Sequence, residues 1–201
     1  MRFGTGQQAA GISRRAILGA GSATLIATMM PQPAFAKDHP SIAYMKQVGK
    51  DMLAAHRQGT TASFLRAIQR HADVAEIALY SLGDYKEKLP ESQRSEYYRG
   101  VATFMARYFA DQSREYPVAK YQIGEATVDS NKEILVTSKV YLMSGQVYTV
   151  SWRLAWRGKG YKVTDVKVLG FSLVYLQRGI FQSYLSKRNG DVTQLVAALN
   201  R

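Results

Sequence analysis

The sequence predicts an α+β domain in which helices cover one face of a single antiparallel sheet. Apolar residues recur at steps of three and four up to about residue 116, then alternate with polar ones from 121 to 169. Helical spacing returns after Gly170. Helices on both sides of a strand run in sequence are typical of this fold class. Hydrophobic residues make up 46% of the 201, enough for one core, and without cysteine its stability must come from packing.

Three helices are expected before the longest one. Residues 41–55 carry one apolar face and end before Gly59, and Thr60 or Thr61 can cap a second helix. Asp73 can cap a third over residues 74–82. A longer amphipathic helix is expected from Pro90, which suits a first turn, to Pro117; its stripe consists of Tyr97, Val101, Phe104 and Tyr108.

The β-rich region predicts a meander of about four strands. The expected strands are residues 121–128, 134–143, 146–156 and 161–169, separated by short turn signals such as Ser144-Gly145. Alternation places Tyr148, Val150 and Trp152 on one apolar face. Asp165 interrupts an apolar strand, and it is expected to be a strand-end or bulge residue bonded to backbone.

Two helices are expected after the sheet. The first has its stripe at Leu173, Leu176, Ile180 and Tyr184 and closes at Asn189-Gly190. Residues 191–194 resemble a capping box for a short final helix. No internal repeat or linker interrupts residues 37–201, which are expected to form a single domain.

Residues 1–36 have the layout of an export signal. A basic start without acidic residues is followed by a weakly apolar stretch, too short to span a bilayer, and by the small residues Ala34 and Ala36. Ser13, Arg14 and Arg15 resemble the start of a twin-arginine motif, although an ordinary basic leader is the alternative. Cleavage is expected after Ala36, with a destination outside the cytoplasm.

The remaining chain is basic. Beyond residue 36 lie 24 Lys and Arg against 15 acidic residues, a net charge near +9. The basic residues are scattered singly, without a nucleic-acid-binding signature, so we expect no nucleic acid partner. A basic solvated face is one interpretation, and attraction to an anionic membrane or acidic partner is the other.

No catalytic or metal-binding constellation is evident. His39, His56 and His71 lack metal-site spacing, and no Gly-x-Ser-x-Gly elbow occurs. We therefore expect neither a cofactor nor a metal, and no catalytic residue.

Two stretches resemble a known family. The first runs from Leu82-Gly83-x-Tyr85 through Leu89-Pro90-Glu91-Ser92-Gln93-Arg94 to Tyr97. The second consists of Tyr161-Lys162-Val163-Thr164-Asp165-Val166, Gly170-Phe171-Ser172-Leu173, Phe181, Leu185, Gly190-Asp191 and Leu195. Both are similar to the MlaC/toluene-tolerance family of periplasmic lipid-transport proteins, in an order that spans residues 41 to 200. Leu169 departs from the pattern, since an acidic residue commonly precedes that glycine.

The resemblance implies a periplasmic lipid carrier that is not an enzyme. It implies an apolar cavity between sheet and helices for phospholipid acyl chains, and it implies an inner-membrane ABC transporter complex and an outer-membrane lipid complex as partners of a monomer. Periodicity by itself favours a filled core. The candidate wall residues are Tyr80, Phe104, Tyr108, Val140, Leu142, Tyr148, Val150, Trp152, Phe171, Leu173, Val174 and Phe181.

Three alternatives remain open. A lipid-modifying hydrolase using the same cleft would gather His39, His56 or His71 with Asp165 at its mouth. An adaptor would have an open groove for a partner's helix instead of a cavity. The carrier's lipid could also be a hopanoid or another polycyclic lipid.

Overall fold

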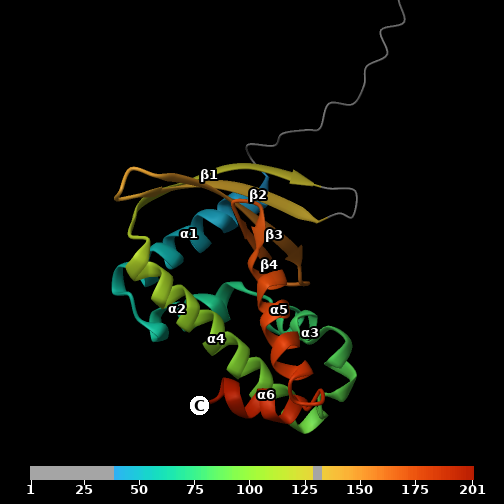
Figure 1. Ribbon diagram of the computed structural model, residues 1–201. Coiled ribbons are helices and arrows are strands. Elements are labelled where there is room, and N and C mark those ends of the chain that lie inside the picture. Colours follow the sequence, from blue (N-terminus) through green and yellow to red (C-terminus); the bar gives the residue numbers. More distant parts are fainter. Residues whose placement is uncertain (1–38, 129–132) are drawn as a thin grey trace, which may run out of the picture. The chain divides into compact units, whose positions relative to one another are not determined.

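A computed structural model describes residues 39–128 and 133–201, and the export signal expected at residues 1–36 lies outside this range. The fold is α+β, as the sequence predicts, with helices beneath one face of a five-stranded antiparallel sheet (Figure 1). The elements are α1 (Pro40–Gln58), α2 (Thr61–His71), α3 (Val74–Leu82), 3-10 turns at Gly83–Lys88 and Glu91–Gln93, α4 (Arg94–Glu115), β1 (Val118–Val128), β2 (Ile134–Leu142), β3 (Val147–Trp156), β4 (Tyr161–Val168), β5 (Phe171–Ser172), α5 (Leu173–Ser186) and α6 (Val192–Leu199).

The polar caps expected from the sequence begin three of the helices. Thr60 Oγ1 accepts a hydrogen bond from the Ser63 N–H at 3.2 Å, and Asp73 Oδ1 accepts one from the Glu76 N–H at 3.1 Å. Asp191 caps α6 in the same way. The long helix differs from expectation: Pro90 precedes a 3-10 turn, and regular α-helix begins at Arg94. Such tightened turns are common at helix starts.

The sheet is a meander in the order β1-β2-β3-β4-β5. The four expected strands are present, and a fifth, two-residue strand that was not predicted follows a tight turn. In that turn Val168 pairs with Phe171, and the intervening Leu169 and Gly170 both have positive φ, 52° and 86°. Two consecutive positive φ angles are typical of hairpin turns that match the twist of the strands.

Asp165 lies beside a β-bulge whose extra residue is Thr164, and it is bonded to backbone as the sequence predicts. It pairs with Arg153, whereas the next pair joins Leu154 to Val163, so β4 carries one extra residue here. Its Oδ1 accepts hydrogen bonds from the Val166 N–H at 2.7 Å and the Val174 N–H at 3.3 Å. The buried carboxylate therefore fastens the first turn of α5 to the bulge.

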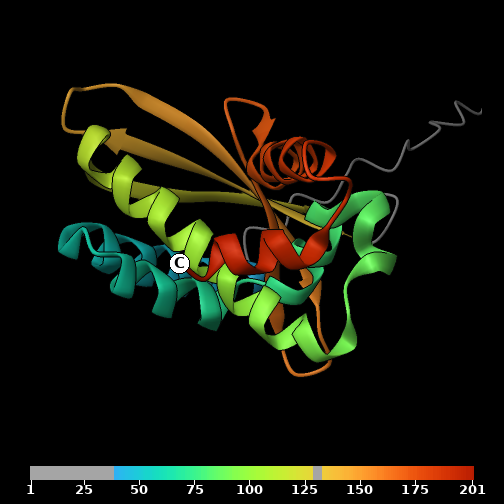
Figure 2. The same cartoon turned by 60° about the horizontal axis from the view of Figure 1, so that its bottom comes forward.

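Buried apolar residues form three separate clusters. One joins α1 to β1–β4 and contains Met45, Val48, Val136 and Leu154. The second joins α2 to α4, which lie side by side in Figure 2 and approach through Ala102, Ala106 and Ala110. The third joins α3, α4, α5 and α6 around Tyr97, Phe181 and Leu185. Because the core is divided in this way, space remains where the clusters face one another.

Candidate functional site: two adjoining apolar cavities

Two cavities lie between the sheet and the helices. The first has a volume of about 390 Å³ and the second about 290 Å³. They adjoin, because they share six lining residues: Met52, Tyr108, Phe109, Trp152, Val166 and Leu173. The two cavities therefore have a common boundary, and together they are bordered by α1 to α5 and the inner face of the sheet.

The sheet side of the first cavity is built by residues in register. Tyr121 pairs with Val140, which pairs with Tyr148 on the next strand, and all three line the cavity. The next row of paired lining residues consists of Ile123, Ser138, Val150 and Val168. Residues opposite one another in an antiparallel sheet share a face, so strict alternation produces a continuous apolar wall.

A single polar pair interrupts that wall. The Trp152 indole N–H donates to Ser138 Oγ at 2.9 Å, and the Ser138 hydroxyl points to the Val150 carbonyl at 3.5 Å. Both polar groups are thus satisfied within the protein, so the wall presents no free donor to an occupant.

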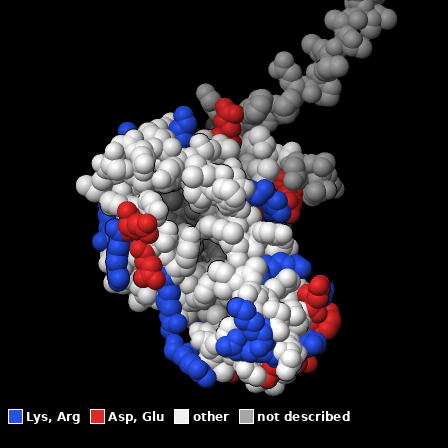
Figure 3. Space-filling model, in the orientation of Figure 1, with Lys and Arg blue, Asp and Glu red and all other residues white. Residues whose placement is uncertain are grey.

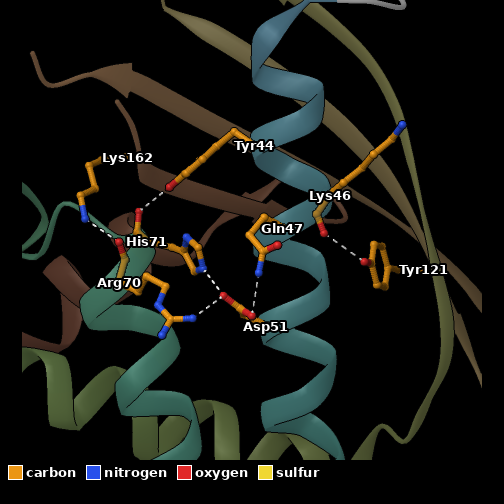
Figure 4. A network of polar contacts seen from close by, with 8 residues as sticks. All are labelled: Tyr44, Lys46, Gln47, Asp51, Arg70, His71, Tyr121 and Lys162. Carbon is orange, nitrogen blue, oxygen red and sulfur yellow. Dashed lines mark hydrogen bonds and ion pairs between the residues drawn. The ribbon is translucent and has the colours of Figure 1, made fainter. Parts of the chain in front are cut away.

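Helix α1 approaches the sheet closely at Gly49. A Cβ atom at this position would lie 2.4 Å from the ring of Tyr121, so only glycine lets the ring lie against the helix. The Tyr121 hydroxyl donates to the Lys46 carbonyl at 3.2 Å (Figure 4). This contact fixes the end of the cavity wall that β1 provides.

His56 lines the first cavity as a neutral imidazole. Its Nε2 accepts a hydrogen bond from the Val118 N–H at 2.9 Å, which requires an unprotonated nitrogen, and burial lowers its pKa. The ring therefore ties the last turn of α1 to the first residue of β1.

His71 borders the second cavity and belongs to a polar network (Figure 4). Its Nε2 donates to Asp51 Oδ2 at 2.7 Å, and this hydrogen bond lowers the pKa of the Asp51 carboxyl to about 2 against the opposing effect of burial. Gln47 and Arg70 bind the same carboxylate, each at 3.0 Å. The Tyr44 hydroxyl donates to the His71 carbonyl, and burial raises the pKa of Tyr44 to about 12. The network joins α1 to α2.

The polar groups at the cavities do not assemble a reactive site. His56 and His71 line different cavities, each holding a structural partner, and the Asp165 carboxylate is bonded to backbone. His39 caps α1. Within residues 39–128 and 133–201, no group of three His, Cys, Asp or Glu side chains could hold a metal ion. No Lys or Arg from that part of the chain lines either cavity.

Nine of the twelve candidate wall residues line the cavities. Phe104 and Val174 line the second cavity, and the first is lined by Val140, Leu142, Tyr148 and Val150. Tyr108, Trp152 and Leu173 line both. The structure thus brings the candidates from α4, the sheet and α5 together around one space.

Three candidates lie outside both cavities. Tyr80 is on the solvent side of α3, where the Arg178 guanidinium covers its ring at 5.1 Å. Phe171 lies at the tip of β5, beyond the enclosed space, and is 68% exposed. Phe181 is buried in the helical core against the edge of Phe104, with ring centroids 5.2 Å apart. Tyr80 and Phe171 are therefore surface residues, and Phe181 belongs to the helical core.

Several residues that line the cavities were not among the twelve candidates from the sequence. Met52 continues the apolar face of α1 four residues after Val48, and Phe109 follows Tyr108 on α4. Helical spacing could have identified both. His56 had no such signal, because its role depends on the position of β1.

The hollow opens between α4 and the β4–α5 segment. Figure 3 shows it on the face of Figure 1, surrounded by residues without charge. Tyr108, Leu169, Leu176 and Ile180 both line the cavities and are exposed at the surface. The mouth is therefore rimmed by apolar side chains.

Comparisons with known proteins agree with this architecture. A solved structure of the phospholipid-binding protein from Ralstonia solanacearum, in complex with a phospholipid, matches 79% of this chain and 95% of its own, with 19% identity and a TM-score of 0.64. No curated protein sequence matches. In the described part of the chain no helix is long and apolar enough to cross a membrane. The family model described as MlaC protein matches residues 42–201. The chain therefore belongs to the MlaC family.

Proposed function

We propose that this protein is a periplasmic carrier that holds the acyl chains of a phospholipid in the two adjoining cavities and moves the lipid between membrane complexes. The observation that carries the proposal is the predominantly apolar lining of both cavities, to which no Lys or Arg of the described residues contributes. The solved Ralstonia structure of the same fold, which is a complex with phospholipid, supports the choice of ligand.

A carrier of this kind needs burial and no reactive group. Moving one chain of roughly 14 methylenes through water costs on the order of 10 kcal/mol, at about 0.8 kcal/mol per methylene. Spontaneous crossing is therefore negligible. An apolar cavity that encloses the chain removes most of that cost, and the headgroup can stay in water at the mouth.

The proposal includes an export route, predicted from residues 1–36, and the partners that the family resemblance implies. We infer that residues 1–36 direct export, with Arg14 and Arg15 as the twin-arginine pair, and that residues 37–201 form the mature domain. The partners would be an inner-membrane ABC transporter complex and an outer-membrane lipid complex. The mature protein would travel between them as a monomer.

The enzyme alternative has less support. It called for a histidine together with Asp165 at the cavity mouth, and His71 and Asp165 do line the same cavity. Both are held by other partners, however, His71 by Asp51 and Asp165 by two backbone N–H groups. Neither is positioned as a free base, so binding without chemistry remains the proposal.

Native mass spectrometry of the exported protein, followed by lipid extraction, tests the function. We expect phospholipid to co-purify at about one molecule per chain, and the extract would distinguish it from a polycyclic lipid. A protein that carries no lipid and takes up none from vesicles would refute the carrier function.

A further inference from the structure

The segment from Leu169 to Ile180 exposes an unusual amount of apolar surface. Leu169, Phe171, Tyr175, Leu176 and Ile180 are between 49% and 68% exposed. These five residues are called the apolar rim segment below. Scattered single apolar residues are normal on a protein surface, but a concentration within twelve positions indicates an interaction site.

The apolar rim segment is continuous with the cavities. Leu169 lines the first, and Leu176 and Ile180 line the second. Hydrocarbon that leaves the hollow by this mouth would pass directly over these side chains. Whatever covers the segment would therefore meet the contents of the cavity.

Leu169 adopts a strained backbone conformation in the turn between β4 and β5. Its φ of 52° is in the left-handed region, which costs a non-glycine residue conformational energy. Glycine would satisfy the same turn without this cost, and asparagine would satisfy it at a lower cost. A strained, exposed leucine beside a cavity mouth indicates that the apolar side chain has a use there.

The charge along this stretch of the chain favours an anionic partner. Residues 166–190 contain Lys167, Arg178, Lys187 and Arg188 and no acidic residue. Residues 37–201 as a whole have a net charge near +9. Exposed Leu, Phe, Ile and Tyr flanked by Lys and Arg are the composition of segments that lie in the interface of anionic bilayers.

We propose that the apolar rim segment rests directly on a bilayer surface that contains anionic lipid. Leu169 and Phe171 enter the boundary between headgroups and acyl chains, and Lys187 and Arg188 at the end of α5 are drawn to lipid phosphates. The cavity mouth then opens against hydrocarbon, so an acyl chain can move between bilayer and cavity without crossing water. The inference rests on the proposed carrier function, because it assigns the surface through which the carrier meets a membrane.

Vesicle sedimentation tests the proposal. Protein recovered after export is mixed with vesicles of phosphatidylcholine alone, or of phosphatidylcholine with phosphatidylglycerol. We expect binding to the phosphatidylglycerol vesicles, weakened by added salt, and little binding to the neutral ones. Absence of binding to the anionic vesicles would overturn the proposal and leave a partner protein as the occupant of the segment.

A matched pair of double variants locates the binding surface. Phe171→Ser with Tyr175→Ser removes two exposed rings that do not line a cavity, and we expect it to lower vesicle binding about tenfold. Met143→Ser with Val147→Ser removes two exposed apolar residues around the β2–β3 turn and should leave binding unchanged. Equal binding by the rim variant and the wild type would overturn the proposal.

The lipid content of the same samples separates this inference from the carrier function. The Phe171→Ser, Tyr175→Ser variant should retain its co-purifying lipid, because neither residue lines a cavity. A wild type that binds anionic vesicles but carries no lipid would refute the carrier function and leave the membrane surface intact. A wild type that carries lipid but does not bind vesicles would refute the membrane-surface proposal and leave the carrier function intact.

Discussion

Trp152 and Ser138, two residues of the sheet wall, are joined by a hydrogen bond between their side chains, with 2.9 Å between Nε1 and Oγ. Ser138 is buried, and Trp152 belongs to both cavities. The bond ties the indole to the neighbouring strand, because the donor comes from β3 and the acceptor from β2. The width of the hollow at the junction of the two cavities therefore depends on this pair.

Ser138→Ala should lower the free energy of unfolding by about 1–3 kcal/mol, since it leaves the indole N–H without its partner. Urea denaturation followed by circular dichroism measures the loss. Trp152→Phe in the Ser138→Ala background removes the orphaned donor, so the second substitution should cost less there than in the wild type. Additive costs would contradict a direct interaction between the two residues.

Filling the wall should exclude lipid without unfolding the domain. Val140→Phe with Val150→Phe places two rings into the first cavity, where both valines line the space. Native mass spectrometry should show about tenfold less bound lipid, which corresponds to about 1.4 kcal/mol of lost binding. Val147→Phe is the control, because Val147 is exposed and lines neither cavity. Unchanged lipid content in the double variant, with its fold intact, would mean that lipid binds elsewhere.

The sequence predicted the sheet wall better than the helix contributions. Strict alternation on β2 and β3 identifies Val140, Leu142, Tyr148, Val150 and Trp152, because a strand with one buried face has only two possible orientations. A helix stripe is less decisive: Phe104 and Phe181 both lie on apolar faces, yet only Phe104 lines a cavity. Which part of a stripe faces a hollow depends on how the clusters pack.

The hydrogen bonds that could be predicted from the sequence are those whose partners lie close together in the chain. The caps at Thr60, Asp73 and Asp191 and the bulge at Asp165 have their main hydrogen-bond partners within three residues. The His56 bond to Val118 spans 62 positions and has no sequence signal. The hollow itself could be inferred only from the family resemblance, because an unfilled core and a filled one have the same periodicity.

His56 should make the stability of the protein fall in mild acid. Burial lowers its pKa in the folded state below the ordinary value of 6.5, so the unfolded chain binds the extra proton more readily. Stability is therefore highest above pH 6.5 and is lost as the pH falls from there through the folded pKa. Urea unfolding at a series of pH values between 8 and 5 measures the slope.

His56→Gln provides the control for that slope. The glutamine side-chain oxygen can accept from the Val118 N–H and does not titrate, so this variant should lose less stability than the wild type over the same pH range. Identical pH profiles would assign the acid sensitivity to another group.

Leu169→Asn should stabilise the fold while weakening the contact with membranes. Asparagine adopts the left-handed conformation at less cost than leucine, so relief at φ 52° should raise the free energy of unfolding by about 1 kcal/mol. The same substitution removes an exposed apolar side chain from the mouth, so binding to phosphatidylglycerol vesicles should fall. Thermal unfolding and vesicle sedimentation of one preparation measure both effects. Higher stability together with weaker binding is the result expected if Leu169 is kept for contact with membranes. If Leu169 were kept for packing, the substitution would lower the stability of the protein. Such a loss would contradict the role proposed for Leu169.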